Sequence, residues 1–327
     1  MLKARNSMGW IFLFIFWAGT QNPPQPSLLK GGTWKTYTQA HGLVDHSVLG
    51  IHRAGDGALW LATSGGGVSR FDGNAWQSFT VEDGLASNSV YAVAEGEEGV
   101  YWFANRGAGL SCFDGKNWRT FTEKDGLADN RIRAIYKDNN GNIWVGTLAG
   151  VTLFDGRAFR SFAERDGLGG KEVYAICQTK DGAMWFGLMD GGVSRLYQGR
   201  WRTFLTQDSL AGNTVKALYE AADGGLWVAT LGGGVFRYSN GNWTNFTIKD
   251  GLASNRVRAI YQARDGALWF ATSKGASRYD GRSWTTFTRA DGLGDDMVNG
   301  ILEDDQGRLW FATMGGLSVF SPSNNEE

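Results

Sequence analysis

Seven short segments of the chain each contain a Val or Ile whose two neighbours change from segment to segment. The residues before it are Ser47, Ser89, Arg131, Glu172, Thr214, Arg256 and Met297, and those after it are Leu49, Tyr91, Arg133, Tyr174, Lys216, Arg258 and Asn299. Arginine can hold a carboxylate through two hydrogen bonds, and tyrosine can stack on a sugar ring. Because the Val or Ile recurs while its neighbours vary, the variable side chains are predicted to serve an anionic or sugar-like ligand.

A second variable position follows the Trp-containing segment of each unit. It holds Ser64, Arg106, Leu148, Met189, Leu231, Ser273 and Met314. Four of these seven side chains are apolar, which is typical of a pocket lining or a channel cap. Both positions are expected on one rim, where the predicted ligand contacts are Arg106, Arg131, Arg133, Lys171, Glu172, Tyr174, Met189, Lys216, Arg256 and Arg258. The competing interpretation is that these side chains are solvated or form salt bridges between units.

Aspartates recur before Gly-Leu, at Asp83, Asp125, Asp166, Asp208, Asp250 and Asp291. Six carboxylates could bind a metal, but a turn whose carboxylate accepts hydrogen bonds from nearby backbone N–H groups explains every copy. An Asn two residues before the Val or Ile behaves likewise, at Asn88, Asn130, Asn213 and Asn255. His46, Lys171 and Asp296 replace this Asn and are therefore more informative.

Three histidines, His41, His46 and His52, lie within twelve residues and could bind a metal or act as a general base. Each occupies a different repeat position, and the pattern fixes no carboxylate beside them. The G-x-S-x-G motif of a nucleophilic serine is absent. Cys112 and Cys177 form no C-x-x-C motif, so filling space is their default role. The sequence therefore predicts no catalytic residue, no metal and no cofactor.

Two aromatic positions recur along the chain and define the unit that must position these residues. The first holds Trp34, Trp76, Trp118, Phe159, Trp201, Trp243 and Trp284, spaced by 41 or 42 residues. The second holds Trp60, Trp102, Trp144, Trp185, Trp227, Trp269 and Trp310, with the same spacing. Seven units therefore fill residues 34–321, and the tryptophans are predicted to be structural.

Each unit contains four short runs rich in β-branched and aromatic residues, as in residues 284–288, 297–302, 308–313 and 316–320. Pairs such as Asp265-Gly266 suit tight hairpins because both residues can take a positive φ. Four antiparallel strands of this length predict a blade, and seven blades predict an all-β, seven-bladed β-propeller. The first run has no preceding blade, so it is predicted to complete the last blade and close the ring.

The unit W-x-x-F-x-x-x-D-G-L-x-x-N-x-V-x-x-I-x-x-x-x-x-G-x-L-W-F-x-T-x-x-G resembles the two-component regulator propeller repeat. The resemblance covers all seven units, with Ser209 in place of the Gly in the fifth. It implies an extracytoplasmic sensor domain like those of bacterial histidine kinases, which often recognise oligosaccharides. The chain shows one ring and no kinase or receiver region, so we expect a binding protein or half of a split sensor, with a membrane histidine kinase or another protein as partner.

The first residues differ from the repeats. Lys3 and Arg5 precede an apolar run at residues 8–19, and a polar, Pro-containing stretch follows. This order is typical of a secretory signal, and the run is short for a membrane span. We therefore expect a signal peptide or short anchor at 1–20, a linker at 21–33, the propeller at 34–321 and a polar tail at 322–327, in a periplasmic or secreted protein. Membrane attachment is expected only through an uncleaved N-terminal segment.

The predicted function is that of an exported, sensor-like propeller that binds a small molecule or an oligosaccharide and contributes to signal transduction. The net charge of −1 argues against a nucleic-acid-binding protein. Two other classes stay open: a protein–protein interaction scaffold that uses the same rim, and a propeller lyase or hydrolase. Seven-bladed lyases of the streptogramin-inactivating kind use an active-site histidine, whereas the later units of this chain contain none. The prediction is therefore a binding protein and not an enzyme.

Overall fold

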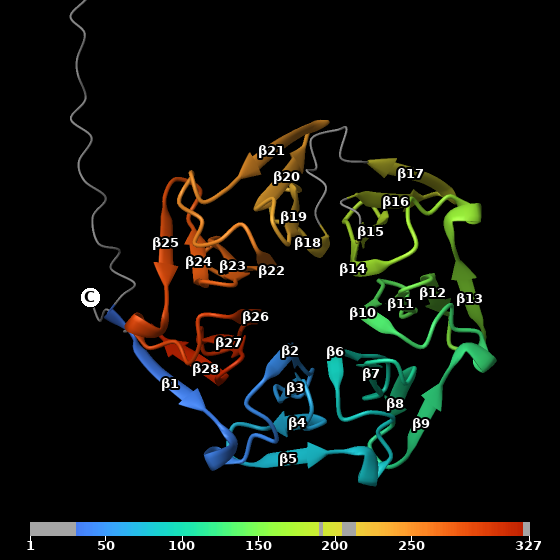
Figure 1. Ribbon diagram of the computed structural model, residues 1–327, viewed down its shortest axis with the longest axis horizontal. Helices are drawn as coiled ribbons and strands as arrows, with labels where there is room; N and C mark the ends of the chain where they lie inside the picture. The colour runs from blue at the N-terminus through green and yellow to red at the C-terminus, as the bar shows by residue number, and fades with distance from the viewer. Residues whose placement is uncertain (1–30, 190–191, 205–213, 323–327) are drawn as a thin grey trace, which may run out of the picture.

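The computed structural model describes residues 31–189, 192–204 and 214–322. These residues form seven four-stranded antiparallel sheets arranged in a ring, with one edge strand of each sheet nearest the centre (Figure 1). The predicted all-β, seven-bladed propeller is confirmed. Within the described ranges, no helix is long and apolar enough to cross a membrane. The predicted signal peptide or anchor at residues 1–20 lies outside those ranges.

Each blade is a meander of four strands that runs outward from the centre of the ring. The innermost strands are β2 (Val48–Arg53), β6 (Val90–Glu95), β10 (Ile132–Lys137), β14 (Val173–Gln178), β18 (Val215–Glu220), β22 (Val257–Gln262) and β26 (Val298–Glu303). The second strands are β3 (Leu59–Thr63), β7 (Tyr101–Asn105), β11 (Ile143–Thr147), β15 (Met184–Leu188), β19 (Leu226–Thr230), β23 (Leu268–Thr272) and β27 (Leu309–Thr313). Every residue of the second strands is buried, as expected of continuous apolar runs.

The outer half of each blade meets solvent. The third strands are β4 (Val68–Phe71), β8 (Leu110–Phe113), β12 (Gly150–Phe154), β16 (Val193–Tyr197), β20 (Val235–Ser239), β24 (Gly275–Tyr279) and β28 (Gly316–Ser321). The outermost strands are β5 (Trp76–Phe79), β9 (Trp118–Phe121), β13 (Phe159–Phe162), β17 (Arg200–Phe204), β21 (Asn242–Phe246), β25 (Trp284–Phe287) and β1 (Thr33–Tyr37). Burial alternates along strands such as β9 and β17, because one face packs on the protein and the other is solvated.

The ring closes through β1, which lies beside β28 and completes the last blade (Figure 1). Trp34 pairs with Phe320 in an antiparallel register, and its ring centroid lies 5.3 Å from that of Phe311. Gly292 takes a φ of 115° against Trp34, where a Cβ would come within 2.7 Å of the ring. The predicted closure by the N-terminal strand is therefore confirmed, and a glycine is required at this contact.

The hydrophobic core lies between neighbouring blades. Trp60 packs on Phe103 of the next blade with ring centroids 5.5 Å apart, and Trp269 packs on Phe311 in the same way at 5.6 Å. All seven second-strand tryptophans are buried. Their predicted structural role is confirmed, since an indole buries a large area between two sheets.

A short 3-10 turn leads from an outermost strand toward the next blade. These turns are η2 (Gln39–His41), η3 (Val81–Asp83), η4 (Glu123–Asp125), η5 (Glu164–Asp166) and η7 (Arg289–Asp291). The Asp83 carboxylate accepts the backbone N–H of Thr80 at 2.8 Å, and the Asn88 side chain accepts that of Val81 at 2.9 Å. The same carboxylate bond recurs at Asp125, Asp166, Asp250 and Asp291. The turn-making role is thus confirmed for these five aspartates, while Asp208 lies outside the described residues.

The 3-10 turns lie at one end of the ring. The hairpins between the innermost and second strands lie at the other end, here termed the far end. Gly266 takes a φ of 84°, and the Asp265 carboxylate accepts the backbone N–H of Ala267 at 2.9 Å. Asp265 itself does not take a positive φ. The predicted tight hairpin is confirmed, and within it the aspartate acts through its side chain while only the glycine uses the left-handed region.

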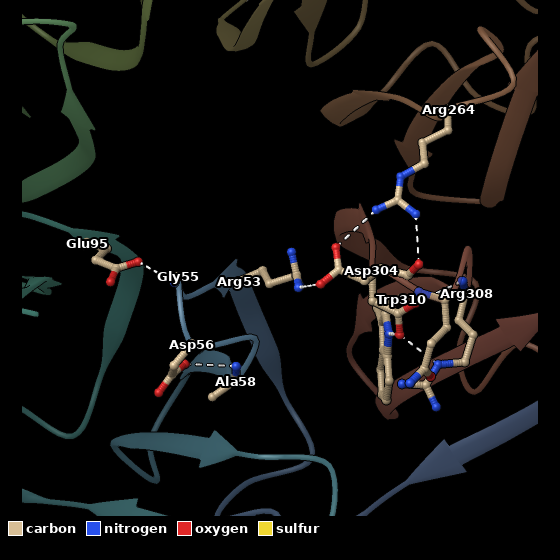
Figure 2. A network of polar contacts seen from close by, with 11 residues as sticks. Arg53, Gly55, Asp56, Ala58, Glu95, Arg264, Asp304, Arg308 and Trp310 are labelled. Carbon is tan, nitrogen blue, oxygen red and sulfur yellow. Dashed lines mark hydrogen bonds and ion pairs between the residues drawn. The ribbon is translucent and has the colours of Figure 1, made fainter.

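At the far end, the last residue of each innermost strand reaches the hairpin of the preceding blade. Glu95 accepts the backbone N–H of Gly55 at 2.7 Å, as Figure 2 shows. The equivalent acceptors are Gln178 for Asn139, Glu220 for Lys180, Gln262 for Ala222 and Glu303 for Arg264. Lys137 donates to the Gly96 carbonyl instead, and Arg53 contacts Asp305. These seven contacts are termed the interblade clasps.

Candidate ligand site in the central channel

The two variable loop positions lie side by side at the end of the ring opposite to the far end, here termed the near end. In every blade, the backbone N–H of the residue after the second strand donates to the carbonyl of the residue before the innermost strand. The donor and acceptor pairs are Ser64–Ser47, Arg106–Ser89, Leu148–Arg131, Met189–Glu172, Leu231–Thr214, Ser273–Arg256 and Met314–Met297. The predicted shared rim is therefore present.

Each innermost strand contains a β-bulge at its second residue. In β10 the pairing skips from Ile132 to Ala134, and in β6 it skips from Val90 to Val93. A bulge re-aims the skipped side chain out of the regular pleat. The skipped position holds Leu49, Tyr91, Arg133, Tyr174, Lys216, Arg258 and Asn299, and all seven line one cavity. These residues are termed the channel ring.

The cavity has a volume of about 240 Å³. Beyond the channel ring, its wall continues with small and apolar residues such as Ala134, Ile135 and Ile176. Among the described residues that line it, three are cationic and two are tyrosines, and none is Asp, Glu or His. The cavity therefore offers positive charge and aromatic faces to whatever enters it.

Within this cavity, cations and tyrosines from the second to the fifth blades contact one another. The Arg133 guanidinium carbon lies 4.8 Å from the ring centroid of Tyr91 and 5.7 Å from that of Tyr174. The Lys216 Nζ lies 5.2 Å from the Tyr174 centroid and 6.0 Å from the Tyr91 centroid. Cation–π contacts at these distances offset part of the cost of holding positive charge away from bulk water.

The pKa values of the cations show that burial still disfavours their charged forms. Burial lowers the pKa of Lys216 to about 8, and repulsion from Arg258 and Arg133 adds to the effect. Burial and the neighbouring Arg256 lower the pKa of Arg258. The Arg258 Nε is buried and has no hydrogen-bond partner among the described residues. The channel ring therefore holds charge that the described part of the chain does not neutralise.

The other predicted contacts lie on the rim. Arg106, Arg131, Lys171, Met189 and Arg256 are exposed. Arg131 donates from Nε to the Asp129 carboxylate at 2.9 Å, so its guanidinium already has an acidic partner. The side chains of Arg106 and Arg256 form no ion pair within the described residues.

Glu172 connects the rim to the channel ring. Its carboxylate accepts the Tyr174 hydroxyl at 3.2 Å. The structure thus brings together four predicted residues in the cavity, Arg133, Tyr174, Lys216 and Arg258. The other six lie on the rim, where Lys171, Glu172 and Met189 line a separate small pocket. Their role in ligand binding stays a prediction.

The predicted contacts omit Leu49, Tyr91 and Asn299, which also belong to the channel ring. Tyr91 faces two of the cations, and Asn299 donates from Nδ2 to the Val48 carbonyl at 2.8 Å, which joins the last blade to the first. The signal that could have included them is their repeat position. In a ring of identical units, residues at one repeat position share one location, whatever their chemistry.

The histidines and cysteines do not line the cavity. His41 accepts the backbone N–H of Thr38 at 3.1 Å and so replaces the turn aspartate, while His52 lies 3.7 Å from the Glu95 carboxylate. His46 is exposed beside Asp45. In the part of the chain that the structure describes, no group of three or more His, Cys, Asp or Glu could hold a metal. Cys112 and Cys177 are free thiols, and burial raises the pKa of each to about 11.

The sequence model of the two-component regulator propeller matches five segments of the chain, at residues 126–149, 167–190, 209–232, 251–274 and 292–315. Five of the seven units therefore match the two-component regulator propeller repeat. Each matched segment begins directly after the aspartate of the D-G-L motif and ends after the second strand, so it contains the channel-ring position but not that aspartate. A comparison with curated proteins gives no match.

Solved structures of similar fold match most of this chain. The extracellular domain of the hybrid two-component system BT3049 from B. thetaiotaomicron is 26% identical, with a TM-score of 0.79 over 89% of this chain and 41% of that chain. The extracellular domain of BT4673 from the same organism is 19% identical, with a TM-score of 0.73 over 88% and 39%. Virginiamycin B lyase from Staphylococcus aureus is 18% identical, with a TM-score of 0.72 over 89% and 99%.

The propeller spans about two fifths of the two-component system structures and nearly all of the lyase structure. At the identities of BT4673 and the lyase, the likeness shows the fold alone. One ring of this size therefore occurs both as part of a sensor protein and as an enzyme, so the function must be argued from the site.

Proposed function

We propose that this propeller is a sensor-like domain that works outside the cytoplasm and binds a small molecule or an oligosaccharide at the channel. The observation that carries the proposal is the channel ring, in which cations and tyrosines from several blades line one cavity. Cations suit acidic groups on a ligand, and tyrosine faces suit sugar rings. The cations of the channel ring, Arg133, Lys216 and Arg258, form no ion pair with the described scaffold, which leaves them available to a ligand.

The extracytoplasmic, sensor-like role is supported by two findings. Five units of the chain match the two-component regulator propeller repeat, and the BT3049 structure with which the chain shares 26% identity is an extracellular domain of a hybrid two-component system. The basic, apolar and polar order of residues 1–33 is typical of a secretory signal. As the partner that would read out the ligand, we propose a membrane histidine kinase or another protein that docks on the rim.

The fold of virginiamycin B lyase raises an enzymatic alternative, which would require groups in the cavity that can transfer a proton. The described lining residues include no His, Asp or Glu, and the titratable groups there are cations and tyrosines. Lys216, with its lowered pKa, is the group that could exchange a proton near neutral pH. No carboxylate or imidazole lies in the lining to act with it, so binding is the function that the geometry supports best.

The proposal is tested by thermal shift and calorimetry with a panel of acidic and neutral oligosaccharides. We expect at least one class to bind and Arg106→Ala/Arg256→Ala to weaken that binding, because both side chains are exposed on the rim and form no ion pair with the described residues. Arg282→Ala is the matched control, since Arg282 is an exposed arginine in the turn between β24 and β25 at the far end. If no saccharide or small anion binds while a protein co-purifies, the interaction-scaffold alternative replaces the proposal.

A further inference from the structure

We propose that the channel ring is a polyanion site: it takes a ligand with two or more carboxylate, sulfate or phosphate groups, which enters from the rim. This inference rests on the proposed function and names the class of ligand. The cations come from Arg133 on β10, Lys216 on β18 and Arg258 on β22, three different blades.

The chain pairs its structural arginines with its own carboxylates. One position on the third strands holds Arg70, Arg195, Arg237 and Arg278, and their partners are Asp56, Asp181, Asp223 and Asp265 in the hairpins of the same blades. Arg133, Lys216 and Arg258 form no ion pair among the described residues. The described residues therefore supply a carboxylate to each of these four third-strand arginines and none to the three cations that line the cavity.

The three cations face one shared space. Lys216 extends from the fifth blade to within 6.0 Å of the ring of Tyr91 on the second blade, and Arg133 lies over that same ring at 4.8 Å. Both Arg133 and Arg258 repel the Lys216 ammonium electrostatically, and this repulsion lowers its pKa. A single ligand in a cavity of about 240 Å³ can thus contact cations from several blades, given that a water molecule occupies about 30 Å³.

The charge count favours a multivalent ligand. Three like charges close together in a partly desolvated cavity repel one another, and the two tyrosine faces compensate only part of this cost. The buried Nε of Arg258 also lacks a hydrogen-bond acceptor within the described residues. A monovalent anion would neutralise one cation, whereas a ligand with two or three acidic groups would satisfy the whole cluster with charge-assisted hydrogen bonds.

Two arginines of the rim add positive charge on the side from which a ligand would enter. Arg256 stands on the rim two residues before Arg258 and acts electrostatically on it, and Arg106 is exposed on the rim of the second blade. These two arginines attract anions, most strongly at low ionic strength, whereas Arg131 is already paired with Asp129 on the same rim.

The test is calorimetric titration of the full chain with four probes: inorganic sulfate, citrate, trigalacturonic acid and neutral maltotriose. Each probe is measured on the wild type, on Lys216→Met and on Lys216→Met/Arg258→Met, which keep side-chain bulk and remove charge. Lys116→Met/Arg282→Met is the matched control, because both residues are exposed in far-end turns. Circular dichroism checks that each variant is folded, and none should be destabilised, since the variants remove repulsion.

We expect the multivalent acids to bind more tightly than sulfate and maltotriose not to bind in the cavity. Each ring charge removed should weaken polyanion binding about tenfold or more, the usual worth of a charge-assisted hydrogen bond, with the control unchanged. Citrate binding without trigalacturonate binding identifies a free small acid as the ligand source, and the reverse identifies an acidic saccharide.

Three outcomes separate this inference from the proposed function. If maltotriose binds and the ring variants do not change its affinity, the polyanion site is overturned and the ligand-binding function stands. If the acids bind equally well to the wild type and both ring variants, the inference is also overturned. If none of the four probes binds, the polyanion site is rejected, and the wider saccharide panel decides the proposed function.

Discussion

The two ends of the central channel are built from the same strands and differ in how they treat variable residues. At the far end, the last position of the innermost strands holds Arg53, Glu95, Lys137, Gln178, Glu220, Gln262 and Glu303. This position varies in charge as much as the channel ring does. Every one of its members, however, contacts the hairpin of the preceding blade as an interblade clasp.

The difference teaches that variation inside a repeat does not by itself mark a ligand site. A repeat position can vary and still be structural when each of its side chains forms a polar contact with the neighbouring blade. Glu95 accepts a backbone N–H, and Lys137 donates to a carbonyl at the same place. The channel ring is distinguished by charge without a partner, and the predictions below test that distinction.

The largest expected effect is on stability at the far end. Asp304 is buried, and its carboxylate accepts the indole N–H of Trp310 at 2.7 Å and the Arg308 Nε at 2.6 Å. Asp304→Ala would leave these donors without an acceptor, so we expect a loss of about 3 kcal/mol in the free energy of unfolding, measured by urea denaturation. A loss below about 1 kcal/mol would show that far-end pairing is not what stabilises the ring.

This contribution should depend on pH in a defined direction. Burial alone would raise the pKa of Asp304, but hydrogen bonds from Trp310 and Arg308 outweigh it and hold the pKa below its usual range. A lowered carboxyl pKa stabilises the fold above the pKa of the unfolded chain, and the stabilisation disappears as the pH falls through the folded pKa. The difference between wild type and Asp304→Ala should therefore shrink below about pH 4.

The next effect concerns ligand affinity and tests the near end. Lys216 faces Arg133, Arg258, Tyr91 and Tyr174, and its lowered pKa of about 8 means that it loses its proton above that pH. A polyanion prefers the protonated form, so affinity should fall about tenfold between pH 7 and pH 9. In Lys216→Met this step should vanish in calorimetry across that range; a step that persists would assign the titration to another group.

A smaller effect is expected on the stability of the free protein. The charged form of Lys216 is disfavoured in the folded state, so it destabilises the fold below about pH 8, and stability rises as the pH increases from there toward the pKa of the unfolded chain. Lys216→Met should therefore raise the free energy of unfolding at pH 7 by about 1 kcal/mol, and its advantage should decline above pH 8. A destabilised Lys216→Met would show that the near end is as structural as the far end.

The smallest effect is a gain at the far end. The residue that accepts the indole N–H of Trp310 is Asp304, and that of Trp185 is Thr179 at 3.1 Å. In the sixth blade this position is Ala263, and the Trp269 Nε1 is buried with no partner in the described part of the chain. Ala263→Thr should supply an acceptor and add about 0.5–1 kcal/mol, measured by thermal unfolding, whereas Ala263→Val is the matched control without a hydroxyl.

The fold could be predicted from the sequence because the same pattern of strands, turns and tryptophans recurs seven times. A spacing of 41 or 42 residues between tryptophans leaves room for four short strands and their turns, and the unmatched first strand requires a closed ring. The turn aspartates could be recognised for the same reason, since one mechanism explains each copy. The repeats thus allow the scaffold to be predicted by comparing the seven units with one another.

The site was only partly predictable. Arg256 and Arg258 are two residues apart and would share one face of a regular strand, yet Arg256 is exposed on the rim and Arg258 lines the cavity. The bulge at the second strand residue separates them, and the sequence carries no separate signal for it. Arg131 differs from Arg256 because Asp129 pairs with it, and that contact depends on loop geometry that residue types alone do not specify.

The closing strand has a mechanical consequence. Thr36 of β1 and Ser318 of β28 are bonded at 2.9 Å although 282 positions separate them. The last blade can therefore form completely only after nearly the whole chain is present, which delays the final step of folding relative to the blades made of consecutive residues. In the finished molecule, tension applied at Thr33 or at Ser321 acts on the same sheet, so the pairing of β1 with β28 sets the force at which the ring first opens.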